Sequence, residues 1–432
     1  MAQPTVARQA ALEALARFRE GELGDRALDA ATDGMEPRER AWTQELVYGT
    51  FRLRGRIDHV LNQFARDGIE SLDPDVLDVL RLGAYQLLEM GSVPPYAAVS
   101  QSVELVRMAG APYAAGLVNG ILQNMQRRPQ FRFPDFGHAP VDHLESWGSH
   151  PRWLVQRWVG RWGRDEARRL VDADNRRPEL YIRPLGISAA DARARLAQAE
   201  IETEAVDFAP DSLRVLSPAT AAQALAVVPA VVQDPSAALV VRYADVPEGA
   251  TVIDLAAAPG GKAMGLAERA GRVAAADMSL RRMGRVVQNA ERLGWDGRVG
   301  AVVADGRRPP FREADAVLLD APCTGTGTFR RHPDGRERQR HRASASHRRQ
   351  AAPRAGDDAG AVVAVRHAAA CVDRDRAADA GEHRDVVGRV AVRGAAVQVE
   401  AFDQGQLPDR VGLGGAVHQV ADQPAGVGAV GH

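Results

Sequence analysis

The sequence predicts a multidomain fold in which an all-α bundle is followed by a small α+β module and a doubly wound α/β domain. The chain has 432 residues, which is too long for one ordinary hydrophobic core. Apolar residues recur at helical spacing from residue 5 to about 128. After Gly249, short strands alternate with helices, as is typical of a parallel sheet. The predicted units are a helical bundle (1–128), a linker with a Trp/Arg-rich helical segment (129–177), the α+β module (178–235), the α/β domain (236–335) and an atypical tail (336–432).

The charge balance and the cysteine count exclude several classes of protein. Lys and Arg total 55 against 56 Asp and Glu, so the protein surface as a whole is not basic enough to bind nucleic acid. Any RNA site must be a local basic patch. Two cysteines, Cys323 and Cys371, cannot supply a disulfide scaffold. Arg8, Glu13 and Arg17 interrupt the first apolar stretch, and no later run approaches the ~18 apolar residues that span a bilayer. We therefore expect a soluble, cytoplasmic protein that acts as a monomer.

The first unit reads as a compact bundle of about six or seven helices. Ile57, Val60, Leu61 and Phe64 follow the spacing of one helical face, and a similar set recurs near residue 121. Asp73 before a proline predicts an N-cap at the start of another helix.

The stretch from Pro129 to about His150 reads as a linker, because it is rich in Pro, Gly, Phe and His. Tryptophans and arginines then alternate over residues 152–169 on what reads as a short helical pair. Such a mixture can stack bases and hold phosphates, which makes it a candidate RNA contact surface. The alternative is that the tryptophans pack inward and the arginines form a solvated face.

The α/β domain carries four predicted strands, each of which ends in an aspartate. They cover residues 251–254, 273–277, 302–305 and 316–320 and end in Asp254, Asp277, Asp305 and Asp320. Ligands bind at the carboxyl ends of such parallel strands. We therefore expect these four carboxylates to line one site.

The first strand leads into the turn Asp-Leu-Ala-Ala-Ala-Pro-Gly-Gly-Lys (residues 254–262), where Lys262 is the only lysine of the chain. A glycine turn at a helix N-terminus leaves backbone N–H groups free and lets a ligand approach the main chain closely. The turn is neither the Gly-x-Gly-x-x-Gly fingerprint nor a phosphate-binding loop, so S-adenosylmethionine fits better than a polyphosphate. Asp277 can accept from two ribose hydroxyls, and Asp305 from the adenine amino group. No metal site is predicted.

The fourth strand leads into a second motif, Asp-Ala-Pro-Cys-Thr-Gly-Thr-Gly-Thr-Phe-Arg-Arg-His-Pro-Asp (residues 320–334). Cys323 follows a strand end beside a glycine-rich loop, a setting that favours the thiolate form. A thiolate can add to carbon 6 of a pyrimidine and so make carbon 5 nucleophilic toward a methyl group. Asp320 can hold the edge of the base. The alternative is that Cys323 is a packed, inert thiol.

Together, these motifs resemble the RNA 5-methylcytosine methyltransferases of the RsmB (Sun/Fmu) type. The first unit agrees, because residues 44–50, 80–88 and 116–120 resemble the NusB-like RNA-binding domain that these enzymes carry. The resemblance spans roughly residues 5–335. It implies a Rossmann-like class I methyltransferase domain that uses S-adenosylmethionine to methylate a cytosine in small-subunit ribosomal RNA that is not yet fully assembled.

The resemblance also assigns roles to residues of this chain. Ala256 stands where the family usually has cysteine, and Ala263 where it usually has threonine; both are tolerable because the backbone does the binding. In the family, the attacking cysteine lies in a later Thr-Cys-Ser motif, while the Pro-Cys thiol, here Cys323, assists product release. No Thr-Cys-Ser occurs in this chain, and Cys371 lies at about the right distance but among unrelated neighbours. The cofactor-binding residues that the resemblance implies are Ala256, Ala257, Ala258, Pro259, Gly260, Gly261, Lys262, Asp277, Asp305 and Asp320.

The tail has a different composition from the rest of the chain. Residues 336–432 contain two leucines, whereas residues 1–335 contain 32. A segment so poor in large apolar residues cannot continue the same core. We hypothesise a change of reading frame near Gly335, which also explains the missing Thr-Cys-Ser; a native disordered extension is the alternative. If the Thr-Cys-Ser motif is truly missing, the chain is either an impaired methyltransferase or an inactive, antitermination-like RNA-binding protein. An enzyme acting on transfer RNA or protein is a third possibility.

Overall fold

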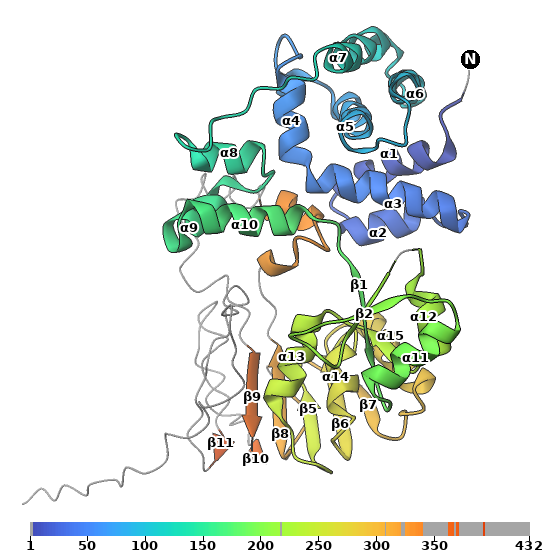
Figure 1. Cartoon of the computed structure of the whole chain (residues 1–432), viewed down its shortest axis with the longest axis vertical. Coiled ribbons are helices and arrows are strands. Elements are labelled where there is room, and N and C mark those ends of the chain that lie inside the picture. Colours follow the sequence, from blue (N-terminus) through green and yellow to red (C-terminus); the bar gives the residue numbers. More distant parts are fainter. Residues whose placement is uncertain are drawn as a thin grey trace, which may run out of the picture.

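The computed structural model describes residues 3–216, 218–306, 308–320 and 325–339, and the backbone of the strand segments 362–366, 369–370 and 392–393. Figure 1 shows a helical part lying against a second part that is built on β-sheets. Cys323 and Cys371 lie outside the described residues. Within the described residues, no helix is long and apolar enough to cross a membrane.

The helical part begins with a seven-helix bundle, as the sequence predicts. The predicted apolar faces form its core, in which Ile57, Val60 and Leu61 are fully buried and Phe64 packs at the edge. Two short 3-10 turns, η1 (Ile69–Ser71) and η2 (Pro112–Ala114), lie between helices. The helices are α1 (Val6–Arg19), α2 (Gly24–Ala31), α3 (Pro37–Arg52), α4 (Arg54–Asn62), α5 (Pro74–Glu89), α6 (Pro95–Met108) and α7 (Ala115–Arg127).

The start of α5 differs from the sequence prediction in one detail. Asp73 occupies the N-cap position and Pro74 the first helical position, but the Asp73 side chain makes no capping hydrogen bond. Its carboxylate accepts instead from the hydroxyl of Tyr113. A tertiary partner has therefore replaced the local one.

Three more helices follow the bundle: α8 (Pro140–Ser146), α9 (Arg152–Trp162) and α10 (Arg164–Asn175). The stretch predicted as a linker thus contains a helix, which begins at a proline that is favourable in the first helical turn.

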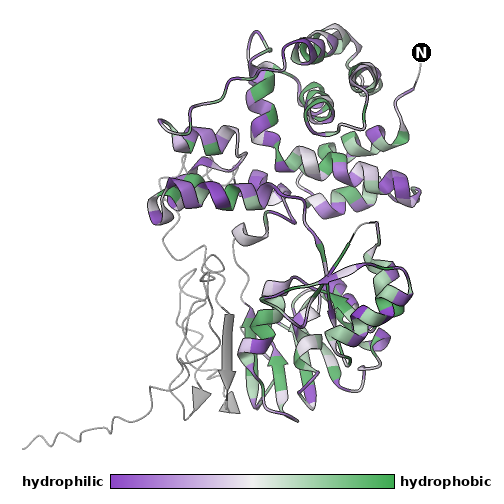
Figure 2. Cartoon of the chain, viewed as in Figure 1, coloured by the Kyte–Doolittle hydropathy of each residue, from purple (hydrophilic) through white to green (hydrophobic). Residues whose placement is uncertain are grey.

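The tryptophans and arginines of α9 and α10 support the inward-packing interpretation. Trp158 is buried in a cluster with Leu144 and Phe329, and the other two tryptophans of α9 pack partly against the same cluster. Several of the arginines pair with acidic side chains; Arg152 pairs with Asp142 and Glu145, for example. Figure 2 shows these helices as a largely hydrophilic surface with apolar residues interspersed. The segment is therefore mainly a packed pair of helices, and several of its arginines are paired with acidic side chains.

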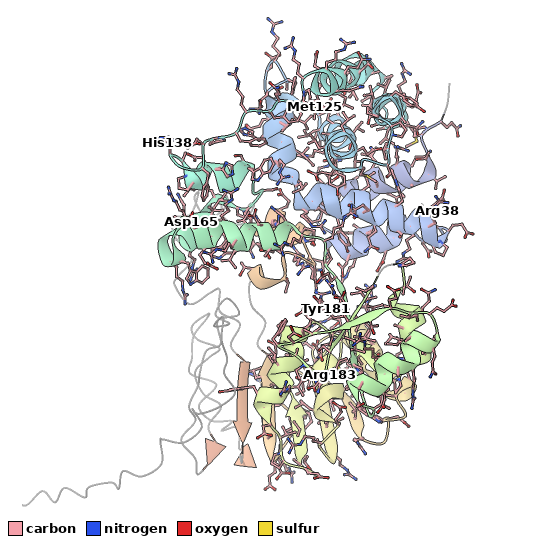
Figure 3. All side chains as sticks on the ribbon, in the orientation of Figure 1. Arg38, Met125, His138, Asp165, Tyr181 and Arg183 are labelled. Carbon is pink, nitrogen blue, oxygen red and sulfur yellow. The ribbon has the colours of Figure 1, made fainter. Side chains whose placement is uncertain are left out.

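The small module is an antiparallel sheet with strand order β2-β3-β1-β4 and two helices. Tyr181 and Arg183 lie on its strand β1 (Figure 3). Arg183 is buried and pairs with Glu268 of the next domain at 2.9 Å, which ties the two sheets together. The elements are β1 (Leu180–Pro184), α11 (Ala189–Gln198), β2 (Thr203–Ala205), β3 (Leu213–Val215), α12 (Ala221–Val227) and β4 (Ala230–Val232).

The larger sheet has strand order β7-β6-β5-β8-β9, and its first four strands are parallel, as predicted. Figure 2 shows the four parallel strands as mainly hydrophobic, as expected for a sheet covered by helices. The elements are α13 (Pro235–Ala244), β5 (Thr251–Asp254), α14 (Gly261–Leu266), β6 (Arg272–Asp277), α15 (Leu280–Arg292), β7 (Val299–Val303) and β8 (Ala316–Asp320). Strand β9 (Val362–Arg366) runs antiparallel to β8, and β10 (Ala369–Ala370) pairs with β11 (Val392–Arg393).

The described chain resumes at Gly325 after β8, forms the 3-10 turn η3 (Thr326–Thr328), and is helical over residues 334–339. This helix crosses the position between 335 and 336 at which the sequence predicts the atypical tail to begin. Arg336 is fully buried, because its guanidinium bonds to backbone carbonyls of the helical part. The residues that pack with the fold therefore extend beyond Gly335.

Candidate active site

Three strand ends bring aspartates to one edge of the larger sheet. In the parallel register, Asp254 at the end of β5 pairs with Ala275 of β6 and Leu318 of β8. Asp277 and Asp320 each end their strand two residues beyond these partners. Because alternate residues of a strand share a face, the register places the three carboxylates close to one another, as predicted.

The turn between β5 and α14 adopts a conformation that depends on glycine. Ala257 N–H donates to the carbonyl of Ala276 on β6 at 2.9 Å, and Gly260 N–H donates to the carbonyl of Ala257 at 2.7 Å. Gly260 has φ +105°, and a Cβ there would lie 3.3 Å from the Cα of Val286. Helix α14 starts directly afterwards, so its first N–H groups face the strand ends. The turn contains the predicted residues Ala256, Ala257, Ala258, Pro259 and Gly260, with a cis bond between Ala258 and Pro259.

Asp254 is the most unusual group of the site. It is 1% exposed, and among the described residues neither carboxylate oxygen makes a hydrogen bond of good geometry, although the backbone N–H of Ala256 lies near it. Burial raises the pKa of Asp254 to about 7, although the positive charge of Lys262 opposes the shift. The Lys262 ammonium itself lies 2.7 Å from the Asp320 carboxylate. A buried carboxylate without a well-formed hydrogen bond favours a cationic group of a ligand.

Asp277 has a different environment from Asp254. It is 5% exposed and accepts from the backbone N–H of Ser279 at 2.9 Å and from the Arg282 guanidinium at 2.7 Å. Both of these bonds reach Oδ1. Oδ2 is the oxygen that remains for the hydroxyls of a sugar, and the fixed Oδ1 holds the carboxylate in place.

Asp305 does not end a strand, contrary to prediction. Strand β7 stops at Val303, which pairs with Asp277, and the N–H of Ala304 then donates to the carbonyl of Asp277 at 3.1 Å. Asp305 lies half-buried in the turn that follows, where its carbonyl accepts from Arg308. It lies near the same sheet edge, two residues beyond the end of β7.

The structure therefore brings the glycine turn, Lys262, Asp277 and Asp320 together, with Asp305 beside them. Cys323 and Cys371 lie outside the described residues, so the structure does not place either thiol. The sequence analysis places Asp254 among the strand-end carboxylates but assigns no ligand group to it, because its burial cannot be predicted from its position at a strand end. Among the described residues, no group of three or more His, Cys, Asp or Glu side chains could hold a metal ion.

Comparison with protein families matches three parts of the chain. Residues 5–127 match the NusB family, residues 150–222 match the ferredoxin-like domain of RsmF/B-like methyltransferases, and residues 243–352 match the family of the 16S rRNA methyltransferase RsmB/F. The third match covers the glycine turn and the strand-end carboxylates described above.

Whole-chain comparisons agree with these matches. The chain is 33% identical over 314 residues to the ribosomal RNA small subunit methyltransferase B of Sodalis glossinidius, covering 69% of this chain and 70% of that protein. It is 31% identical over 345 residues to the protein of that name from Pseudomonas syringae pv. tomato, covering 76% and 74%. Among solved structures, the crystal structure of PH0851 is similar, with a TM-score of 0.60 and 26% identity over 81% of this chain and 82% of that one.

Proposed function

This chain belongs to the family of the 16S rRNA methyltransferase RsmB/F, and from that premise we propose that it methylates carbon 5 of a cytosine in small-subunit ribosomal RNA. The observation that carries the proposal is the buried Asp254 carboxylate beside the glycine turn and Asp277, which makes no hydrogen bond of good geometry among the described residues. The NusB match over residues 5–127 supports an RNA substrate over a protein substrate. We further propose that the enzyme acts in the cytoplasm, as a monomer, on RNA that is not fully assembled into the subunit.

The residues of the site fit S-adenosylmethionine, the cofactor of this family. The ligand carries an ammonium and a sulfonium, and the buried Asp254 carboxylate suits such cations. Asp277 offers an oxygen to the ribose, Asp305 can accept from the adenine amino group, and the Ala256–Gly261 backbone receives the carboxylate of the amino acid part. When bound, S-adenosylmethionine supplies an electrophilic methyl group.

On the substrate side, the reaction needs a thiolate and a group that holds the base. The thiolate adds to carbon 6 of the cytosine, which makes carbon 5 nucleophilic toward the methyl group. After methyl transfer a base takes the carbon-5 proton, and the electron pair of that C–H bond re-forms the C5–C6 double bond and expels the thiolate. We assign Cys323 to product release and Asp320 to the edge of the base. The Lys262 ammonium lies 2.7 Å from the Asp320 carboxylate and holds its orientation for this task.

The missing Thr-Cys-Ser motif makes turnover of this chain slow or absent in our proposal. The family match reaches residue 352 and the described helix reaches residue 339, so we place the departure from the family sequence beyond Gly335. A frame change in the gene explains the departure. Resequencing the gene from codon 325 onward tests it, and an intact frame that agrees with relatives to the end would refute it.

The second candidate function is an RNA-binding protein without catalysis, which the absence of Thr-Cys-Ser favours. Methyl transfer to unmodified small-subunit ribosomal RNA separates the two functions, with Cys323→Ala and Cys371→Ala tested separately. If Cys371 is the nucleophile, Cys371→Ala abolishes transfer, whereas Cys323→Ala lets the RNA accumulate as a covalent complex. Full activity in the Cys371→Ala protein would exclude Cys371 from the attack.

A further inference from the structure

The segment from Phe329 to Glu337, here called the clasp, connects the sheet edge of the active site to the helical part. It follows β8, whose last residue is Asp320 of the site. Figure 1 shows this segment, in orange, between the helical part and the larger sheet. Its side chains contact several separate regions of the chain, so its position is set by tertiary contacts.

The first half of the clasp is attached to the small module. The Arg331 guanidinium pairs with Asp234, just before α13, at 2.7 Å. The Arg330 guanidinium donates to the carbonyl of Arg177, between α10 and β1, at 3.0 Å and lies 3.7 Å from the carboxylate of Glu179, directly before β1. These contacts hold the clasp against the small module and the start of the domain that carries the larger sheet.

The second half is attached to the helical part through Arg336. Its guanidinium donates to the carbonyl of Arg52 at 2.8 Å, to the carbonyl of Asp174 at 2.9 Å and to the side-chain oxygen of Asn175 at 2.7 Å. Arg52 is the last residue of α3, and Asn175 is the last residue of α10. Carbonyls in the last turn of a helix lack intrahelical partners and carry partial negative charge, so one guanidinium caps two helices.

The surroundings of Arg336 are closed to water. Arg336 is 0% exposed and lies over the ring of Phe329, which is itself 1% exposed. His150 is also fully buried nearby, and its pKa is lowered to about 4 by burial and by the charge of Arg336. The imidazole is therefore neutral, and the guanidinium carries the local positive charge. An ion pair between Arg54 of α4 and Glu337, at 3.3 Å, also attaches the clasp to the helical part.

We propose that Arg336 is a positioning residue, which fixes the helical part over the strand-end edge so that RNA held by the helical part reaches the cofactor. The RNA element of this inference rests on the proposed function, whereas the interdomain attachment does not. The three hydrogen bonds of the Arg336 guanidinium given above all reach the helical part, and none of the three reaches the glycine turn or the aspartates of the cofactor site. Loss of the guanidinium therefore separates RNA binding from cofactor binding.

The test compares Arg336→Met, which keeps the apolar stem, and Arg336→Lys, which keeps the charge, with the control Arg272→Met. Arg272 is exposed at the opposite end of β6 from the site. In the Arg336→Met protein, the affinity for S-adenosylmethionine stays within about twofold, while the affinity for an unmodified small-subunit RNA fragment falls about tenfold, because the two RNA-binding halves are no longer preorganised. Arg336→Lys restores part of the RNA affinity, since an ammonium bonds fewer of the three oxygens.

Scanning calorimetry supplies a readout that needs no ligand. The wild-type protein and Arg272→Met unfold in one shared transition, whereas Arg336→Met unfolds in two separated transitions. Unchanged RNA affinity together with an unchanged single transition would overturn the proposal. An equal loss of RNA and cofactor affinity would also overturn it, because that result means general misfolding. If the wild-type protein binds no cofactor, the proposed function fails, but calorimetry still decides the role of the clasp.

Discussion

Replacing Gly260 in the glycine turn should destabilise the protein, because any side chain at this position would be strained. Gly260 has φ +105°, and a Cβ would stand 3.3 Å from both the Cα and the Cγ2 of Val286. An L-residue in such a conformation costs roughly 1–2 kcal/mol. The contact with a fully buried residue of α15 adds strain, so Gly260→Ala lowers the free energy of unfolding by about 1–3 kcal/mol.

A matched control comes from Gly284, which lies exposed within α15, where a Cβ meets nothing within 4 Å. Alanine is a better helix former than glycine, so Gly284→Ala raises the free energy of unfolding by about 0.5–1 kcal/mol. Urea unfolding followed by circular dichroism measures both values. In the Gly260→Ala protein the turn also shifts, and the affinity for S-adenosylmethionine falls by up to roughly tenfold, equivalent to 1.4 kcal/mol. If Gly260→Ala is as stable as Gly284→Ala, the reasoning from backbone strain is wrong.

Two further predictions concern pH and packing. The pKa of Asp254 is raised from 3.8 to about 7, so the folded protein binds this proton more tightly than the unfolded chain, and stability falls as pH rises from about 4 to about 7. The ionised form suits a cationic ligand, so the affinity for S-adenosylmethionine rises as pH increases through 7. Calorimetric titration at pH 6 and pH 8 measures this change. If the Asp254→Asn protein shows the same change of affinity with pH as the wild type, the assignment to Asp254 is wrong. In the helical bundle, a Cβ at Gly49 would lie 1.9 Å from the ring of Tyr85, so Gly49→Ala costs about 1–3 kcal/mol or prevents folding. Thermal unfolding checks this change, and a melting temperature equal to that of the wild type would refute it.

Local patterns were sufficient to predict the elements that build the active site. Strand bounds and parallel pairing followed from short apolar runs that end in aspartate, and β5 and β8 begin and end at the predicted residues. Asp305 was misplaced because the end of β7 is set by its register with β6, which no local pattern contains.

Contacts between distant segments could not be predicted. The inward packing of Trp158 depends on Phe329, which is far away in the sequence. Arg336 bonds to backbone carbonyls 284 and 162 positions away, and a carbonyl leaves no sequence signature. The composition changes after Gly335, and the sequence therefore suggested that the folded part ends there. In the structure the packing continues past Gly335, because Arg336 bonds to distant backbone carbonyls that leave no sequence signature.

The most direct test of the account is titration calorimetry of S-adenosylmethionine into the purified, folded protein. We expect micromolar affinity in the wild-type protein and no measurable binding in Asp277→Ala, because that carboxylate receives the ribose. Absence of binding to the folded wild-type protein would contradict the assignment of the strand-end carboxylates as a cofactor site.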